Sequence, residues 1–410
     1  MKKILIIGFV WPEPSSSAAG RRMLDLIRYF AEQSYKITFV STAKKTDFSA
    51  DLATYGVRTE TIKLNDESFD QFVISLKPDV VLFDRFMTEE QFGWRIAKCC
   101  PHALRILDTE DLHFLRDARA ASVKKYGNLA NVELYTDLCK REIASIYRCD
   151  LSLFISEAEI ELLQRTFEVP SYLLVYFPLI HYKSEEKEER KKTFIERNHF
   201  ISIGSFRHAP NTDAVQQLKH KLWPEIRKQL PKIELHIYGS YCTEAISALT
   251  NTKEGFIVKG RAQSVSGIME KARAYLAPLR FGAGIKGKLV DAMENELPGV
   301  TTSIGAEGIS DSSFWNGFIA DDETDFIAAA VKLYTDESLW NRAIEKGRIL
   351  LSEKCSKKSA YEALSESLQA VTADLLVHRK LNFTGAMLMH HTLQSTRYLA
   401  KYITLKNSMQ

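Results

Sequence analysis

The sequence has no apolar run approaching the roughly 20 residues that a helix needs to cross a bilayer. Its cysteines form no C-x-x-C pair and no metal-ligand spacing, which argues against a zinc module or a disulfide framework. They are typical of the reduced thiols of a cytoplasmic protein. The formal net charge is only +3 over 410 residues, so no global excess of positive charge indicates a nucleic-acid partner. The cysteines are Cys99, Cys100, Cys139, Cys149, Cys242 and Cys355.

The first half of the chain also lacks the G-x-G-x-x-G fingerprint of dinucleotide-binding enzymes. A buried-strand pattern at 4–10 is followed by a loop and a helical pattern, as in a Rossmann half. After Gly8, however, the chain runs through Trp11 and two prolines. This absence argues against an NAD-dependent enzyme.

What is present is ordinary globular composition, with 45% hydrophobic and 26% charged residues, and enough chain for two domains. Short apolar runs alternate with helical patterns, which predicts an α/β fold built on parallel sheets. In the first half the expected strands are 4–10, 36–42, 80–84, 103–108, 151–156 and 171–177. In the second half they are 200–204, 233–239, 256–260, 274–279 and 299–303, and the chain beyond Phe314 is expected to be mostly helical.

The segment from 274 to 308 is the most informative. A buried strand leads into a loop with Gly282, Gly284 and Lys286, then a helical pattern, a second strand, and the glycine-bearing loop SIGAEG. Glycines let the backbone approach a ligand, and a helix N-terminus adds partial positive charge. With Lys288 also nearby, these features suit a diphosphate. Asp291, about one helical turn on, could accept two hydrogen bonds from a ribose diol.

A simpler alternative stays open for this segment. It could be an ordinary strand–helix–strand crossover in which Lys288 and Asp291 pair on the solvent face, as residues three apart on a helix can. The density of glycines favours the ligand-binding interpretation, because glycine in regular structure costs stability.

This segment resembles the donor-binding core of retaining glycosyltransferases of family 4, which have the GT-B fold. Those enzymes usually carry an acidic residue, seven further residues, and a second acidic residue that heads an "EAM" helix. Asp291-Ala292-Met293 resembles the second half of that pattern, whereas the first acidic position falls on Ala283. A glycine-lysine loop stands in its place, as in some bacterial branches of the family.

The resemblance implies two Rossmann-like domains facing each other across a cleft. The expected domains are an acceptor-side domain at 1–182, a donor domain at 183–377, and a C-terminal helix at 378–410 that packs back on the first domain. The charged segment 183–197 reads as a solvated linker. In the donor domain, Asn211 is expected to cap a helix.

The resemblance also implies further donor-site residues. Arg207 follows a strand end, as the family's phosphate-binding arginine does, and Gly260 and Arg261 match the loop beside the nucleotide base. Glu307, in the second glycine-bearing loop, is assigned to the donor site as well. In the first domain Gly20 is the best match to a glycine near the donor phosphate, with a simple helix start as the equal alternative.

A cluster of polar residues follows the strand at 103–108. Asp108, Glu110, Asp111 and His113 lie just past its carboxyl end, where open α/β sheets place ligand chemistry. The family often has a histidine in this half near the reacting sugar, and His113 is the candidate. Helix-capping carboxylates beside a partly exposed histidine would give the same pattern.

By this resemblance the chain is a glycosyltransferase in bacterial-type glycan or glycoconjugate synthesis. It would move a sugar, with retention, from a UDP- or GDP-sugar to a hydroxyl of a glycan, lipid-linked or protein acceptor. Arg207 and Lys286 would stabilise the leaving diphosphate. No metal, cofactor, protein nucleophile or nucleic acid is expected. The protein is expected in the cytoplasm, with peripheral contact at the inner membrane face because the last helix is amphipathic and basic.

Two alternatives come from other functional classes. A nucleotide-sugar 2-epimerase of the same fold would need acid and base groups, which the cluster from Asp108 to His113 could supply. A non-catalytic partner subunit that binds nucleotide-sugar or glycan would account for Ala283 at the first acidic position.

Overall fold

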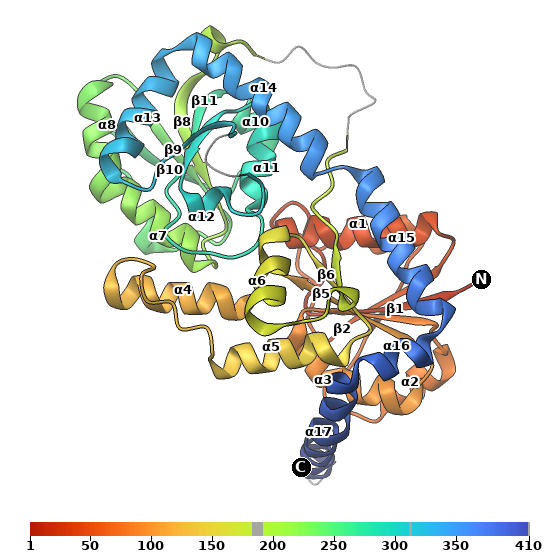
Figure 1. The fold of residues 1–410 in the computed structure, drawn as a ribbon. Helices are drawn as coiled ribbons and strands as arrows, with labels where there is room; N and C mark the ends of the chain where they lie inside the picture. The colour runs from red at the N-terminus through yellow and green to blue at the C-terminus, as the bar shows by residue number, and fades with distance from the viewer. Residues whose placement is uncertain (183–191, 311–313, 409–410) are drawn as a thin grey trace. The chain divides into compact units, whose positions relative to one another are not determined.

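The computed structural model describes residues 1–182, 192–310 and 314–408. The chain divides into two compact units. The first unit contains Met1–Phe114, Tyr135–Phe177 and Lys358–Gln410, and the second contains Leu115–Leu134 and Pro178–Lys357. Most of the predicted linker, 183–191, lies outside the described residues. Strands form the centre of each unit, with helices around them (Figure 1).

The first unit is built on a seven-stranded parallel sheet in the order β3-β2-β1-β4-β5-β6-β7. Ile4, Leu5, Ile6 and Ile7 of β1 are fully buried, because a central parallel strand is covered on both faces. The strands are β1 (Lys3–Gly8), β2 (Lys36–Ser41), β3 (Arg58–Thr61), β4 (Val80–Asp84), β5 (Leu104–Glu110), β6 (Leu151–Phe154) and β7 (Leu174–Tyr176). The helices are α1 (Ala18–Glu32), α2 (Ser68–Leu76), α3 (Phe86–Cys99), α4 (His113–Tyr126, divided between the units), α5 (Asp137–Arg148), α6 (Glu157–Phe167), α15 (Lys357–Ala373), α16 (Leu375–Leu381) and α17 (Phe383–Ser408).

The second unit is built on a six-stranded parallel sheet in the order β10-β9-β8-β11-β12-β13. Its core joins sheet residues such as Phe200 and Leu276 to Trp223, Phe326 and Trp340 of the helices. The strands are β8 (Asn198–Ile203), β9 (Leu235–Tyr238), β10 (Phe256–Gly260), β11 (Ala272–Ala277), β12 (Gly299–Thr301) and β13 (Gly317–Ile319). The helices are α7 (Ala209–Gln217), α8 (Trp223–Gln229), α9 (Glu244–Ser247), α10 (Val265–Met269), α11 (Gly287–Glu294), α12 (Ser303–Ala306), α13 (Glu323–Thr335) and α14 (Glu337–Lys354), with a π-helical turn at Leu218–Leu222.

The predicted strands are all present, but two further strands were missed. β3 has the sequence RTET and β13 has only three residues, so neither carries an apolar run that would mark it. Both lie at the edges of their sheets. The expected second glycine loop is also different, because its first four residues form the short helix α12, capped by the Thr302 hydroxyl.

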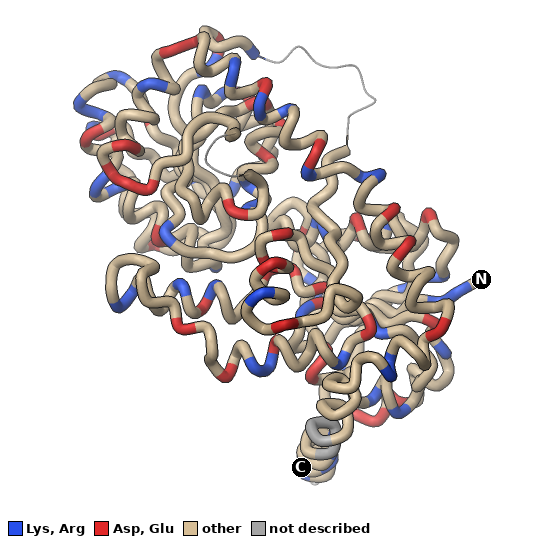
Figure 2. Tube along the Cα trace, viewed as in Figure 1, with Lys and Arg blue, Asp and Glu red and all other residues tan. Residues whose placement is uncertain are grey.

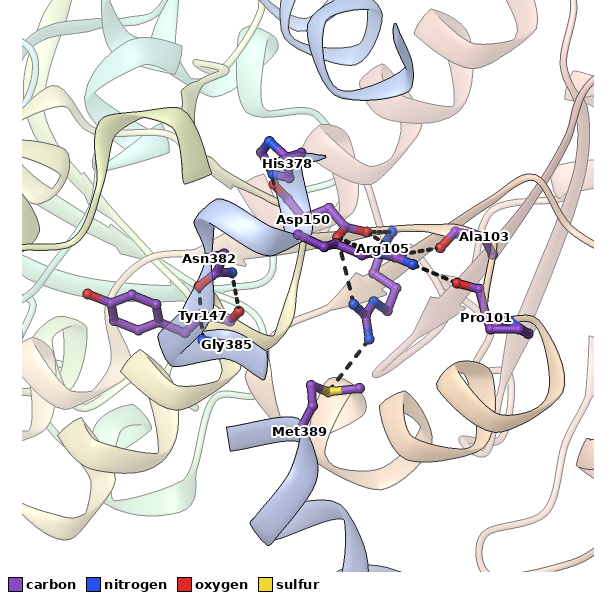
Figure 3. Close-up of polar contacts among 10 residues, drawn as sticks. Pro101, Ala103, Arg105, Tyr147, Asp150, His378, Asn382, Gly385 and Met389 are labelled. Carbon is purple, nitrogen blue, oxygen red and sulfur yellow. Dashed lines mark hydrogen bonds and ion pairs between the residues drawn. The ribbon is translucent and has the colours of Figure 1, made fainter. Parts of the chain in front are cut away.

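The helices α16 and α17 are tied to the first unit by a network around Asp150 (Figure 3). Arg379 donates two hydrogen bonds to the Asp150 carboxylate, at 2.7 and 2.8 Å, and two more to the carbonyls of Pro101 and Ala103. The Arg105 amide donates to the same carboxylate at 2.8 Å. These contacts agree with the predicted return of the last helix to the first domain.

A second contact fixes the start of α17. Asn382 donates to the Tyr147 carbonyl and accepts from the Gly385 amide (Figure 3). A Cβ atom at Gly385 would lie 2.1 Å from the Tyr147 carbonyl oxygen, so only glycine allows this approach. Within the described parts of the chain, no helix is both long enough and apolar enough to cross a membrane.

Candidate functional site

The candidate site lies at the point in the second sheet where strand order reverses. β8 and β11 are neighbours, and the following strands extend from them in opposite directions. At such a point the loops after the two strands diverge and leave room for a ligand at the carboxyl edge of the sheet. Arg207 follows β8, and the loop with Gly282, Gly284 and Lys286 follows β11. The fold therefore brings these predicted residues to one edge.

The glycines after β11 hold conformations that other residues adopt with strain. Gly282 has φ 155° and Gly284 has φ 62°. The chain then turns so that Lys286 occupies the N-cap position of α11, the positive end of that helix. The Lys286 ammonium donates to the Gly284 carbonyl at 2.7 Å and is largely buried. The loop thus folds over Lys286, the lysine that was predicted to bind a diphosphate.

An arginine that the sequence did not single out organises this loop. Arg119 donates to both oxygens of Glu307, at 2.6 and 2.7 Å, and to the Gly282 carbonyl at 2.8 Å. The ammonium of Lys286 lies 3.8 Å from the same Glu307 carboxylate. Burial alone would raise the pKa of Glu307, but the hydrogen bonds from Arg119 and the charges of Lys286 and Arg119 outweigh it, so the pKa is lowered. Glu307 is therefore an ionised anchor between two cations.

Arg119 could not have been found from the sequence. It is one of many charged residues between 105 and 125, and it lies far along the chain from 282 and 307. No spacing rule links such positions, because the contact depends on where α4 lies. In the structure Arg119 belongs to the second unit, like its partners.

The start of α11 is also joined to the start of α7. Lys288 donates to the Asn211 side-chain oxygen at 2.6 Å, and Asn211 in turn donates to the Ser205 carbonyl. Arg280 of the glycine loop pairs with Asp213 of α7. Asn211 was predicted to cap α7, but the helix begins three residues earlier than this prediction requires, and His208 holds the cap position.

Lys288 has an unusually low pKa for a lysine. Burial, together with the nearby charge of Lys286, lowers its pKa to about 7. Its ammonium lies against Asn211, a neutral acceptor, which differs from the predicted alternative of a Lys288–Asp291 pair.

Asp291 lies half-buried on α11, near Tyr275. Burial raises the pKa of Tyr275, and the charge of Asp291 raises it further. The Tyr275 hydroxyl donates to the Ile203 carbonyl at the end of β8, at 2.9 Å. Asp291 is therefore on the same edge of the sheet as the loops after β8 and β11.

The other donor-side residues follow neighbouring strands. Arg207 is exposed and its guanidinium lies 3.5 Å from the centre of the Tyr241 ring, which follows β9. Gly260 ends β10 with φ 71°, and Arg261 beside it is exposed. The carboxyl ends of β8 and β10 thus contribute the predicted residues, and the end of β9 contributes Tyr241, the partner of Arg207.

Gly20 and His113 belong to the first unit. The Gly20 amide donates to the Ser17 hydroxyl, which caps α1, and a Cβ atom at Gly20 would lie 2.5 Å from the Glu13 backbone. Close packing at the start of α1 therefore requires glycine at this position, and the assignment of Gly20 to the donor site stays a prediction.

His113 begins α4. Its amide donates to Glu142 at 3.1 Å, and its imidazole Nε2 lies 3.6 Å from an Asp111 oxygen and edge-on to Phe86. Asp108 is fully buried in an ion pair with Arg22 at 2.7 Å, so the cluster from Asp108 to His113 is not one solvent-facing set of acids and bases. In the described parts of the chain no group of His, Cys, Asp and Glu residues is arranged to hold a metal ion.

Comparison with known proteins agrees with this geometry. Residues 197–336 match the family model described as "Glycosyl transferases group 1". The chain carries a glycosyltransferase domain. That domain contains the whole candidate site except Arg119. A curated relative, an uncharacterized 44.6 kDa protein in the cps region of Klebsiella pneumoniae, is 26% identical over 194 residues, which are 46% of this chain and 47% of the relative. The match therefore spans about half the length of that relative.

Solved structures show the fold beyond the glycosyltransferase domain. TarM of S. aureus, in a complex with fondaparinux, α-GlcNAc-glycerol and UDP, superposes with a TM-score of 0.67 at 11% identity, over 90% of this chain and 99% of that one. The pneumococcal O-GlcNAc transferase GtfA, with UDP and GlcNAc, gives 0.65 at 14% identity, over 91% and 99%. HepE of Anabaena, with UDP-glucose, gives 0.64 at 12% identity, over 90% and 100%. The predicted two-domain α/β fold of the GT-B type is confirmed.

Proposed function

We propose that this protein transfers a sugar from a nucleoside diphosphate sugar to an acceptor hydroxyl. The observation that carries the proposal is the glycine loop after β11, which holds Lys286 at the N-terminus of α11 between the loop and an Arg119–Glu307 pair. Such a lysine at a positive helix end suits the charge of a diphosphate. The GtfA and HepE structures were solved with UDP or UDP-glucose, which supports a nucleotide-sugar donor here.

The chain's own groups suffice for the charge that develops in this reaction. As the bond to the sugar breaks, negative charge gathers on the leaving diphosphate. Lys286 would turn from the Gly284 carbonyl to a phosphate oxygen, and Arg207 would add a second cation. Both carboxylate oxygens of Glu307 accept hydrogen bonds from Arg119. Glu307 would therefore affect donor binding indirectly, by positioning Lys286. Asp291 would accept hydrogen bonds from the ribose, and Gly260 and Arg261 would lie beside the base.

The finer assignments follow the family resemblance. They are a UDP- or GDP-sugar donor, retention at the anomeric carbon, an acceptor that is a glycan, a lipid-linked glycan or a protein, and a role in bacterial-type glycan synthesis. His113 is assigned near the reacting sugar. No observation favours the epimerase, and the buried Arg22–Asp108 pair removes one of its proposed acid–base groups.

The test is a transfer assay on the full chain with UDP- and GDP-sugars, with and without a glycan acceptor. We expect acceptor-dependent release of UDP or GDP, undiminished in EDTA because the charge is stabilised by Lys286 and Arg207. Conversion of the donor to its epimer without acceptor would establish the alternative enzyme. Binding without turnover would indicate a non-catalytic subunit, and rescue of EDTA-treated protein by Mg²⁺ would refute metal independence.

Binding of a diphosphate should be linked to a proton at Lys288. Its folded-state pKa is about 7, so at pH 8 the amine is mostly neutral. A bound diphosphate favours the charged form and raises that pKa, so wild type should take up close to one proton per UDP or GDP bound at pH 8. Isothermal calorimetry in buffers of different ionisation enthalpy measures this number. Lys288→Met should abolish the uptake, and equal uptake by both proteins would place the titrating group elsewhere.

Asp291→Asn should weaken nucleotide binding by about 1–3 kcal/mol, the cost of an unmatched hydrogen bond to a charged group. Asparagine keeps the size and one acceptor but replaces the other with a donor, so one ribose hydroxyl loses its partner. The melting temperature without ligand should stay near that of wild type. The affinities of wild type and mutant should then be measured for each nucleotide and for its 2′,3′-dideoxy form, which gives a thermodynamic cycle for the contact between Asp291 and the ribose. If wild type and mutant discriminate equally between the two ligands, Asp291 does not contact the ribose.

A further inference from the structure

The charge of this protein is distributed unevenly along the chain. After Asp374 the sequence contains no aspartate or glutamate up to Gln410. The same segment contains the basic residues Arg379, Lys380, Arg397, Lys401 and Lys406, so it carries +5. Because the whole chain carries +3, the remaining 374 residues carry −2. In Figure 2 no red is visible on the described part of α17, next to the C-terminal label.

The helix α17 exposes a row of large apolar side chains. We call this row the α17 stripe. Its members are 47–69% exposed and are separated by four, eleven, four and three residues, each close to a whole number of turns at about 3.6 residues per turn. They therefore share one face of the helix. The stripe consists of Phe383, Met387, Tyr398, Tyr402 and Leu405.

The other face of α17 is held against the first unit, which keeps the stripe outward. Ala400 is buried, and the Thr404 hydroxyl, one turn on, donates to the Asn65 carbonyl. Near the start of the helix, the Arg105 guanidinium lies 3.6 Å from the sulfur of Met389, and Gly385 packs on Tyr147. The helix cannot roll about its axis to bury the stripe without breaking these contacts.

We propose that the α17 stripe docks on the surface of an anionic lipid bilayer. Exposed large apolar side chains gathered on one face mark an interaction surface. Lys401 and Lys406 lie on the stripe's side of the helix and are exposed. Tyrosine beside lysine is the composition that lies at a bilayer interface, with apolar rings in the acyl boundary and ammonium groups at lipid phosphates.

The charge distinguishes a bilayer from a second copy of the chain. A symmetric dimer through α17 would bring together two helices that each carry Arg397, Lys401 and Lys406 and no acidic residue of their own to offset them. An anionic bilayer offers the opposite charge and also accepts the apolar rings. A helix that spans the bilayer is a different structure, and α17 is not long and apolar enough to form one.

The experiment is vesicle flotation of the full-length protein at low and high salt, with neutral phosphatidylcholine vesicles and with vesicles that also contain phosphatidylglycerol. We expect the protein to bind the anionic vesicles only, and we expect this binding to be lost at high salt because surface charge is screened.

Removing both lysines (K401A/K406A) should lower the partition coefficient about 30-fold, since each basic residue near the surface contributes about fivefold. Replacing the rings (Y398S/Y402S) should lower it at least about tenfold. These side chains are exposed, so the melting temperature should not change.

Matched controls lie on the second unit. Lys232→Ala and Ile195→Ser replace an exposed lysine and an exposed isoleucine, and both should bind vesicles as wild type does. Equal binding to neutral and anionic vesicles, or full binding by the lysine double mutant, would overturn the proposal. Absence of vesicle binding together with a dimer that dissociates in Y398S/Y402S, by light scattering, would assign the stripe to a second copy. The experiment needs no turnover, so it is independent of the proposed sugar transfer.

Discussion

Arg379→Ala is expected to destabilise the first unit by about 3 kcal/mol, the lower end of the range for breaking a buried ion pair. Asp150 is almost completely buried, and Arg379 donates two hydrogen bonds to its carboxylate. Removing the guanidinium leaves a buried carboxylate with Arg105 as its remaining partner among the described residues, and it also leaves the carbonyls of Pro101 and Ala103 without this donor. Denaturant unfolding followed by circular dichroism measures the loss.

The loss of stability caused by Arg379→Ala should also depend on pH. Burial raises the pKa of Asp150, but the hydrogen bonds from Arg379 and the charge of Arg105 outweigh it, so the pKa is lowered. A lowered carboxylate pKa adds stability above the unfolded-state value, and this stability is lost as the pH falls through the folded-state value. The difference between wild type and Arg379→Ala should therefore be large at pH 7 and should shrink in acid.

Arg58→Ala is the matched control. Arg58 pairs with Glu60 in the same unit, but both side chains are about half exposed, so the change should cost less than about 1 kcal/mol. Equal losses in the two mutants, or a loss in Arg379→Ala that does not vary with pH, would show that Asp150 does not anchor the C-terminal helices.

Lys286→Ala is expected to weaken binding of UDP or GDP by roughly 1.5–3 kcal/mol, about 10- to 150-fold, the range for a hydrogen bond to a charged group. The ammonium is held near the helix N-terminus by the Gly284 carbonyl and by Glu307, so it is already close to the place proposed for the diphosphate. Glu307 keeps both hydrogen bonds from Arg119 in the mutant, which should therefore stay folded. Titration calorimetry on the folded mutant measures the dissociation constant.

Two further variants separate charge from position. Lys253→Ala removes an exposed lysine of the same unit and should bind like wild type. Arg119→Gln keeps Lys286 but releases Glu307, so it should weaken diphosphate binding less than Lys286→Ala does. An unchanged dissociation constant in Lys286→Ala would reject the phosphate assignment, and a larger loss in Arg119→Gln would make Arg119 the main phosphate ligand.

Local patterns were enough to predict an α/β fold built on parallel sheets, and the family resemblance added the two-domain arrangement. Short apolar runs such as those that begin at 4 and at 274 are typical of parallel strands covered on both faces, and they form β1 and β11. The glycines at 282 and 284 indicated an unusual loop, since φ values of 155° and 62° are strained for other residues. The resemblance to glycosyltransferases rested on the same segment, which lies inside the matched region 197–336. The edge strands β3 and β13 carry no such pattern and were missed.

Contacts between distant segments were decided only by the tertiary structure. Arg119 donates hydrogen bonds to Glu307, 188 residues away, and Asp108 forms a buried ion pair with Arg22. Lys288 meets Asn211, and neither partner is marked by spacing along the chain. The sequence shows which side chains carry charge, but a charge acquires its role from burial and from the partner within hydrogen-bond distance. The sequence also shows a basic segment after Asp374, whereas only the packing of Ala400 and Thr404 decides that the α17 stripe faces outward.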